Sequence, residues 1–411
     1  MRLSDPSYVL LMGVVLFSSQ LWAFEHTKVL PKGIRNLTLK SVNTTIGGKT
    51  NSDGHIEAIA KPLEKDLDFK RILKGESDYL KKTQLEGLML QYGFDYDDSL
   101  GQIKADMKGS VAVTAPLLSY GLTDNFTLAI AVPYYQAKMR VKTGFAINQG
   151  TANRLLKKME DLSQTKAANE VAEKLNDAIG ELNKKLRDNN YREMTDWEGS
   201  GIGDVTIAGK LKAVDGDKIK LASTNGFVIP TGKTSDPDVL NDIPFGKGTL
   251  DFFTALAVDE YLTKDIFFNQ FVKYTHHFPA KRNLRMATED ESIEVKKTNA
   301  DYELGANWDS GVSVQYEPQS GFVAGIGYIY GRKYGDDYKL ENNPESVQKL
   351  EKDTHQENHF WEAKLGYSGV NAYRRGELPA PFAASVEYKK HIASINNFSN
   401  DFVTVDLALY F

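Results

Sequence analysis

The chain ends on the segment Phe402-Val403-Thr404-Val405-Asp406-Leu407-Ala408-Leu409-Tyr410-Phe411. Its odd-numbered positions are all apolar, whereas the even-numbered ones include Thr404 and Asp406. Successive side chains of a strand point to opposite faces, so this alternation predicts a strand with one apolar wall and one more polar wall. The fold class therefore depends on whether the same pattern recurs upstream.

The alternation does recur, with charges opposite the hydrophobic residues. The apolar parity reads Val205, Ile207, Gly209 and Leu211; Tyr302, Leu304, Ala306, Trp308, Val312, Val314 and Tyr316; Trp361, Ala363, Leu365 and Tyr367; and Phe382, Ala384, Val386 and Tyr388. The opposite parity carries the candidate pore-lining residues Lys210, Lys212, Asp251, Asp259, Glu303, Asp309, Glu362, Lys364, Glu387, Lys389 and Asp406. In a closed cylinder these side chains would face the lumen.

Strand length separates a membrane barrel from a soluble sandwich, which alternates in the same way. Membrane-spanning strands need about 9 to 11 residues, against about 5 to 6 in ordinary sheets. The segments that meet this length are 203–213, 249–261, 301–316, 321–334, 359–371, 381–393 and 400–411. Aromatic residues near their ends would form the interfacial girdles of a barrel, namely Tyr302, Trp308, Tyr316, Phe360, Trp361 and Tyr367.

Short and long connections also alternate. The tight turns are Thr123-Asp124-Asn125, Asp215-Gly216-Asp217, Thr263-Lys264-Asp265 and Glu317-Pro318-Gln319-Ser320, and the long joins fall at about 47–106, 147–200, 232–247, 279–298 and 336–356. Outer-membrane barrels combine short periplasmic turns with long outer loops. We therefore predict an all-β fold, a closed antiparallel transmembrane β-barrel of about 12 strands, with outer-loop insertions at 47–106 and 147–200. The least regular strands are expected around 34–46 and 219–230.

The first residues have the layout of a secretory signal peptide. Arg2 precedes the apolar run 8–17, and the small residue Ala23 stands before a polar segment. The run is shorter than the ~18 to 20 apolar residues that span a bilayer, which disfavours a membrane anchor, and a buried strand is the other alternative. We expect 1–23 to be removed near Ala23, leaving 24–411 as a barrel in the outer membrane of a Gram-negative bacterium.

Composition narrows the classes further. The 411 residues include no cysteine, so disulfides do not hold this exported protein together. The mean hydropathy of −0.41 is too polar for a bundle of membrane helices. The formal net charge of −5 comes from charges scattered along the chain, which gives no basic stripe for nucleic acid.

Two of the long joins carry helical patterns. Between 153 and 190, apolar residues recur at three- and four-residue spacing, at Leu155, Leu156, Met159 and Leu162 and at Val171, Leu175, Ala178, Leu182 and Leu186. This spacing predicts a helical hairpin on the outer surface, broken near Ser163-Gln164. A self-packed loop is favoured over a partner-binding or gating element, because an amphipathic stripe usually buries itself. A further helix around 77–91 would cap the mouth or enter the lumen.

Motifs for catalysis and metal binding are incomplete. The segment Gly232-Lys233-Thr234 resembles the end of a phosphate loop, but Phe227 stands where a glycine is needed. The pairs His355/His359 and His276/His277 lack further zinc ligands, and we interpret them as solvated loop residues.

One serine–histidine grouping is close in sequence, that of His391 and Ser394 near Asn396 and Asn397. A serine hydrolase needs a serine beside a histidine that an Asp or Asn orients. We interpret this grouping as ordinary polar residues at a strand end. The sequence thus predicts no enzyme activity, no catalytic residues, no metal and no cofactor.

Several short motifs resemble those of a known family. Gly201-Ile202-Gly203-Asp204, Pro230-Thr231-Gly232-Lys233, Tyr120-Gly121-Leu122-Thr123-Asp124 and Val132-Pro133-Tyr134 look like the G-x-G-D, L-P-T-G, Y-G-L-T-D and I-P-Y motifs of the MetA-pathway phenol-degradation family of outer-membrane proteins. The resemblance covers about 110–280, with a weaker likeness in Leu30-Pro31-Lys32-Gly33 and the last strands.

That resemblance implies a transporter-like barrel that passes or binds small, hydrophobic or aromatic compounds and has no catalytic residues. The helical insert 151–190 departs from the family pattern. The last strand, with Val405, Leu407, Leu409 and Phe411, is similar to the C-terminal signal read by the barrel-assembly machinery.

Three functions remain as hypotheses: a channel or transporter for small solutes, a structural or adhesive barrel that displays the helical hairpin, and, least favoured, an outer-membrane hydrolase. About twelve strands leave a narrow lumen, whose mixed charges would either bind polar solutes or pair and close it. The expected partners are outer-membrane lipid, the barrel-assembly machinery, a small-molecule solute and an extracellular partner of the 153–190 helices, with no nucleic acid.

Overall fold

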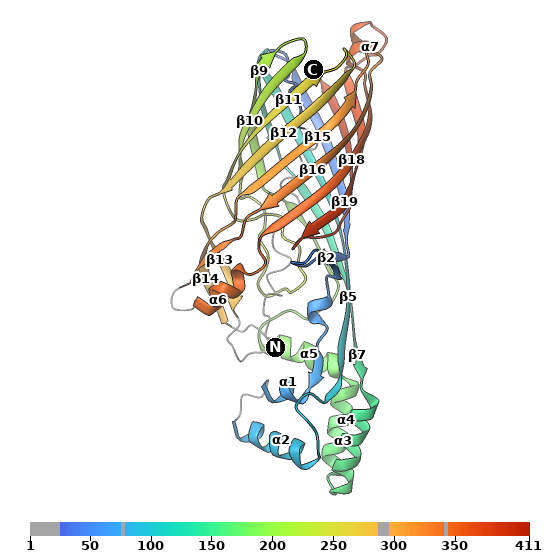
Figure 1. The fold of residues 1–411 in the computed structure, drawn as a ribbon, viewed down its shortest axis with the longest axis vertical. Coiled ribbons are helices and arrows are strands. Elements are labelled where there is room, and N and C mark those ends of the chain that lie inside the picture. The colour runs from blue at the N-terminus through green and yellow to red at the C-terminus, as the bar shows by residue number, and fades with distance from the viewer. Residues whose placement is uncertain (1–24, 75–78, 287–295, 341–343) are drawn as a thin grey trace.

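The strands close into one tall barrel (Figure 1) in a computed structural model that describes residues 25–74, 79–286, 296–340 and 344–411. The signal-peptide prediction lies outside these residues. The wall consists of β1 (Arg35–Ile46), β5 (Ser99–Thr123), β6 (Phe126–Ala131) with β7 (Tyr134–Ile147), β8 (Trp197–Ile202) with β9 (Val205–Asp215), β10 (Ile219–Ile229), β11 (Asp251–Tyr261), β12 (Ile266–His277), β15 (Asn307–Tyr316), β16 (Phe322–Lys333), β18 (Gln356–Ser368), β19 (Phe382–Ile395) and β20 (Phe402–Tyr410).

Closure comes from β1, which pairs antiparallel with β20 on one edge and with β5 on the other. Two wall positions are each shared by a pair of strands: β6 and β7 are interrupted at Val132-Pro133, and β8 and β9 at Gly203-Asp204. The barrel therefore has twelve strand positions, as the sequence predicted. The first strand and the strand at 219–229 are both present despite their irregular sequences.

The two ends of the barrel differ. The upper end in Figure 1, the turn end, carries the four predicted tight turns, the C-terminus and a longer connection with α7 (Val370–Arg374). The lower end, the loop end, carries the long insertions. These hold η2 (Lys61–Leu63), α1 (Phe69–Lys74), α2 (Tyr79–Gln91), α3 (Gln149–Asp161), α4 (Thr165–Asn176), α5 (Ala178–Asp188), α6 (Pro344–Glu351), β2 (Gly48–Thr50), β3 (Ile56–Ala58), β4 (Asp66–Asp68), β13 (Ala280–Met286), β14 (Lys296–Glu303) and β17 (Asp337–Lys339).

Burial follows the predicted parity along the wall. Val403, Leu407 and Leu409 of β20 are exposed on the outside of the barrel, whereas Phe402 and Thr404 are buried on the inside. Four of the six predicted girdle aromatics are exposed, namely Trp308, Tyr316, Trp361 and Tyr367. The apolar parity therefore forms the outer surface of a closed cylinder.

The girdle prediction was wrong for the other two aromatics. Phe360 is buried, because it shares the inward parity of Glu362 on β18. Tyr302 is buried because 301–316 is not one strand: β14 ends at Glu303 and joins a separate sheet with β13 and β17. The chain bends at Gly305, where a Cβ would lie 2.0 Å from the carbonyl oxygen of Tyr334.

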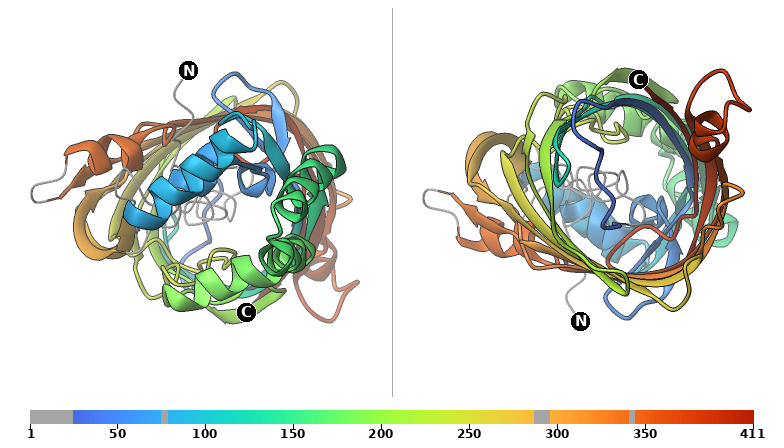
Figure 2. Two further views of the ribbon diagram at one scale, coloured as in Figure 1. Left: turned by 90° about the horizontal axis from the view of Figure 1, so that it is seen from below. Right: turned by 90° about the horizontal axis from the view of Figure 1, so that it is seen from above.

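The insert predicted as a helical hairpin has three helices. The first break is at Ser163, whose φ is +59°, as predicted, and a second separates α4 from α5 at Asp177. The apolar stripes of α3 and α4 pack against the first long insertion, in a cluster that contains Leu155, Met159, Leu175, Phe69, Leu73, Met89, Tyr92 and Phe94. The two insertions thus form one helical head beyond the loop end, and α2 lies across the outline of the opening (Figure 2, left). None of the described helices has the length and hydropathy needed to cross a bilayer.

Candidate functional site: the interior of the barrel

Charged side chains face the interior on most of the wall. Of the predicted residues, Asp251, Asp259, Glu362, Glu387 and Lys389 are at most 5% exposed, and Lys210, Lys212, Asp309, Lys364 and Asp406 are half-buried on the same inward parity. Glu303 is the exception, because it lies on β14 in the separate sheet and not on a barrel strand. Ten of the predicted residues therefore meet inside the barrel.

Several of these charges are paired with a partner of opposite sign. Lys40 Nζ lies 3.3 Å from Asp406 Oδ2, and Lys389 Nζ lies 3.8 Å from Glu362 Oε2. Buried charges are strongly unfavourable without such partners. Both oxygens of the Glu387 carboxylate, however, accept no hydrogen bond from the described residues.

A polar cluster near the loop end is centred on Asp251. One carboxylate oxygen, Oδ1, lies 2.6 Å from His277 Nδ1 and accepts a 2.7 Å hydrogen bond from Thr249 Oγ1, while Lys247 Nζ lies 3.2 Å from Oδ2. His277 is fully buried, so the interpretation of this residue as a solvated loop histidine was wrong. The burial is predictable from alternation, since His277 shares the inward parity of Asn269 and Lys273 on β12. Among the residues described, no three His, Asp or Glu side chains converge as ligands for a metal ion.

The N-terminal segment, residues 25–33, runs inside the ring near the turn end (Figure 2, right). Asp259 Oδ2 accepts hydrogen bonds from the backbone N–H of Thr27 at 3.1 Å and from its hydroxyl at 2.5 Å. On the neighbouring strand, Asn269 donates to the carbonyl of Glu25 at 2.9 Å. Two strands from β11, on β9, Lys210 Nζ donates to the carbonyl of His26 at 2.9 Å. The start of the described chain is thereby fixed to one sector of the wall, from β9 to β12.

Two motifs of the family resemblance contact each other where this segment leaves the lumen. The backbone N–H of Gly33 donates to the carbonyl of Gly121 at 2.8 Å, and that of Lys32 donates to Asp124 Oδ1 at 3.0 Å. A Cβ on Gly121 would lie 2.0 Å from the carbonyl oxygen of Pro31. The glycine of Tyr120-Gly121-Leu122 is therefore required for the close approach of the N-terminal segment.

Two of the other motifs, Gly201–Asp204 and Pro230–Lys233, hold a second segment in place, residues 230–250, which we call the inner loop. Asp204 accepts hydrogen bonds from the backbone N–H groups of Gly232 and Lys247, each at 2.9 Å. The Thr231 hydroxyl donates to the carbonyl of Gly203 at 2.7 Å. The Gly203-Asp204 and Thr231-Gly232 motifs thus form one anchor, although neither motif predicted the contact.

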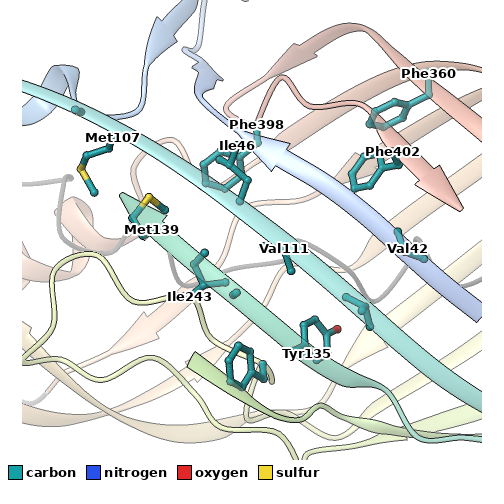
Figure 3. Close-up of a cluster of buried hydrophobic side chains, with 14 residues drawn as sticks. Val42, Ile46, Met107, Val111, Tyr135, Met139, Ile243, Phe360, Phe398 and Phe402 are labelled. Atoms are coloured by element: carbon teal, nitrogen blue, oxygen red, sulfur yellow. The ribbon is translucent and has the colours of Figure 1, made fainter. Parts of the chain in front are cut away.

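The inner loop packs an apolar surface against the inside of the wall (Figure 3). Phe245 stacks on Tyr135 with ring centroids 5.5 Å apart and lies 6.4 Å from the ring of Trp197. The same apolar cluster includes Val42, Ile46, Met107, Val111, Val113, Ala137, Met139 and Ile243. The interior therefore has an apolar sector over β1, β5 and β7, and the polar cluster around Asp251 lies on β11 and β12.

The inner loop also carries a carboxylic acid in an unfavourable environment. Burial raises the pKa of Asp242 to about 6, although the backbone N–H of Asp236 donates to its carboxylate at 2.7 Å. The side chain is 5% exposed. Deprotonation of Asp242 therefore opposes the folded position of the inner loop.

The serine–histidine grouping is brought together at the loop end. His391 Nε2 lies 2.8 Å from Ser394 Oγ, which is also 2.8 Å from Thr50 Oγ1 of the β2–β3 hairpin. Asp401 accepts a hydrogen bond from the backbone N–H of His391, not from its ring. The Ser394 hydroxyl holds the hairpin to the wall through its contact with Thr50. Because Ser394 is 3% exposed, it is not accessible as a nucleophile.

Comparison with known proteins gives a likeness in fold. No protein-family model and no curated protein matches the chain. The structure is similar to the crystal structure of the COG4313 outer membrane channel from Pseudomonas putida F1, at 12% identity and a TM-score of 0.53 over 95% of this chain and 100% of that chain.

Two other solved structures are related less closely. The Ralstonia pickettii toluene transporter TbuX matches at 8% identity over 94% of this chain and 92% of that chain, with a TM-score of 0.35. The transport unit of the autotransporter AIDA-I from Escherichia coli matches at 9% identity over 99% and 98%, with a TM-score of 0.34. The first likeness alone places the chain in a fold class, that of closed outer-membrane β-barrels.

Proposed function

We propose that this barrel is an outer-membrane channel for small solutes that are hydrophobic or aromatic. The observation that carries the proposal is the apolar sector inside the wall, around Met139, Val111 and Phe245. Water-filled barrels have polar interiors, so an apolar interior favours solutes with apolar groups. The resemblance to the MetA-pathway phenol-degradation family and the fold shared with the COG4313 channel support the same class.

Passage through the barrel requires two segments to move. The N-terminal segment lies in the lumen near the turn end, held to β9 and β11, and the inner loop packs against the inside of the wall. Neither is a strand, so each can move without breaking the hydrogen-bond ladders of the wall. The pore-lining residues we propose are the ten inward charges described above, with Asp259 and Lys210 at the N-terminal segment.

The remaining features of an exported protein belong to the same proposal. They are removal of 1–23, insertion with the short turns in the periplasm and the long insertions outside, and recognition of the outward apolar residues Val405, Leu407 and Leu409 by the barrel-assembly machinery. We propose no catalytic role, because the one Ser–His contact is buried.

Liposome swelling and planar-bilayer recording test the proposal. A panel of aromatic alcohols, alkyl alcohols and sugars of matched size should show faster entry of the first two classes. Deletion of residues 25–30 should raise the conductance, whereas deletion of 374–377, which are exposed in the α7 connection at the same end, should not. A barrel that stays sealed to every solute after removal of 25–30 would contradict the channel proposal.

A second function is favoured by the exposed helix of the head. Tyr79 and Leu80 of α2 are 77% and 71% exposed, which is unusual for large apolar side chains. We propose, as the alternative, a surface barrel whose helical head binds an extracellular partner. Deletion of 151–190, against which α2 packs, and replacement of Tyr79 and Leu80 by serine should then each abolish binding to host or bacterial cells while solute entry is unchanged, and retained binding in both variants would exclude this role for the head.

A further inference from the structure

Polar side chains point outward from the middle of β10 and β11. On β10, Ser223 and Asn225 point outward, and Asn225 is exposed. Asn225 pairs in register with Thr254 of β11 on one side and with Gly209 of β9 on the other. We call Ser223, Asn225 and Thr254 the polar patch.

The polar patch lies within the apolar band and not at its edge. Asn225 is six positions along the strand from Ile219, where β10 begins at the turn end. At a rise of ~3.3 Å per residue and a tilt of ~40°, this places Asn225 roughly 15 Å from the turn-end start of β10, where Glu260 faces outward beside Ile219, and so inside an apolar band of about 25 Å. Large apolar side chains surround it, namely Phe227, Leu256, Leu211, Ile207 and Phe252.

The opposite side of the barrel has no such interruption in its outward positions. Outward residues there are aliphatic, with Leu365 of β18 60% exposed, Val386 of β19 51% and Leu407 of β20 53%. Closer to the turn end, the polar line continues on the Asn225 side, where Gln270 of β12 donates to Glu260 of β11 at 3.3 Å. The outward polar residues of β10, β11 and β12 are therefore neighbours on one face, and Ser41 and Asn43 of β1 form a separate outward polar pair.

An amide in hydrocarbon is unfavourable unless it is hydrogen-bonded. Among the described residues, the hydrogen bond of the Asn225 side chain is one from Nδ2 to Ser223 Oγ, at 3.1 Å. The second N–H and the carbonyl oxygen of this carboxamide point to the outside of the barrel, where lipid offers no partner. Leaving such a group unpaired in lipid is unfavourable. Polar residues within membranes usually pair with other protein segments.

We propose that this face is an interface within the membrane, and that a second copy of this chain covers it across a two-fold axis near Asn225. A carboxamide both donates and accepts, so two Asn225 side chains related by the axis satisfy each other. The small side chains of Ser223 and Thr254 leave room for the second barrel to approach, whereas the Phe126 ring lies over Gly209. A two-fold interface uses the same surface on both copies, which a patch of this self-complementary kind fits.

The absence of cysteine from the sequence makes the test direct. Single variants Asn225→Cys and Val386→Cys, the latter six wall positions away on the opposite side, are oxidised in native membranes and run without reductant. We expect a disulfide-linked dimer with Asn225→Cys at a yield several-fold above that with Val386→Cys. Equal yields from the two variants would overturn the proposal.

Two further measurements separate a second copy from other occupants. In nanodiscs, the unaltered protein should have the mass of a dimer, and Asn225→Leu should shift it to the monomer while the folded band on unheated gels is retained. A monomeric mass for the unaltered protein would overturn the proposal. Photo-crosslinking from position 225 needs no disulfide. Crosslinks from that position to lipid, to solute or to a polypeptide of another size would also overturn the proposal.

Discussion

Replacing Thr27 by valine should loosen the N-terminal segment from the lumen without changing the wall. The substitution removes the 2.5 Å hydrogen bond from the Thr27 hydroxyl to Asp259, while the carboxylate keeps the Thr27 backbone N–H and Asn269 Nδ2, the latter at 2.6 Å. A hydrogen bond to a charged group contributes about 1.5–3 kcal/mol. The ratio of released to bound segment should therefore rise about 10- to 100-fold.

Single-channel recording measures that ratio as open probability. The matched control is Thr404→Val, because Thr404 is a buried inward threonine on β20 whose side chain has no hydrogen bond to the N-terminal segment. We expect Thr27→Val to increase the time spent in the conducting state, and Asp259→Asn to act in the same direction. If Thr27→Val and Thr404→Val gave the same open probability, the N-terminal segment would not be a barrier to conduction.

Three further predictions concern the inner loop and the buried serine. The pKa of Asp242 lies near 6 in the folded chain, above its ordinary value of 3.8, so its stabilising effect is complete below pH 4 and is lost as the pH rises through 6. Asp242→Asn should therefore raise the heat-modification midpoint at pH 7.5, with a gain of up to ~3 kcal/mol in the free energy of unfolding. It should also flatten the dependence of this midpoint on pH between pH 4 and 7. An unchanged pH dependence would contradict the pKa assignment. Gly203→Ala should destabilise the barrel by ~1–3 kcal/mol, because the added Cβ would lie 2.3 Å from the Tyr135 ring, and a midpoint equal to that of the unaltered protein would show that the ring moves freely. Ser394→Ala should leave the rates of ester hydrolysis and of solute entry unchanged, and a loss of ester hydrolysis specific to this variant would restore the hydrolase hypothesis.

The inward and outward faces of the wall could be predicted from period-two alternation, and its closure into a barrel from strand length and the spacing of turns. Alternation gave the right face for Lys210, Asp251 and Glu362, because burial inside and lipid outside impose opposite requirements on neighbouring residues. It failed at Glu303, where the strand ends before the barrel begins. The reason is the tight approach of Gly305 to Tyr334, a contact that local sequence does not record.

The contents of the lumen could not be predicted in the same way. Thr27 and Asp259 are 232 positions apart, and the N-terminal segment and the inner loop have no periodic pattern. Their only traces in the sequence are short glycine motifs, which are needed where two backbones come close. The motifs at Gly121 and Gly203 carry the family likeness. Their physical role is to allow the close approach of the chain that holds these segments.

The length of β5 has a consequence for what meets this protein first from outside. Its 25 residues extend about 80 Å, whereas about 10 residues cross the bilayer. The surplus pairs with β7, and at its far end also with β4, as a stalk in which Ile103 lies opposite Phe145. In the proposed orientation, with the turn end in the periplasm, the stalk would lift the helical head clear of the lipid headgroups, and an antibody or a phage tail fibre would touch the head well before it reached the rim of the barrel.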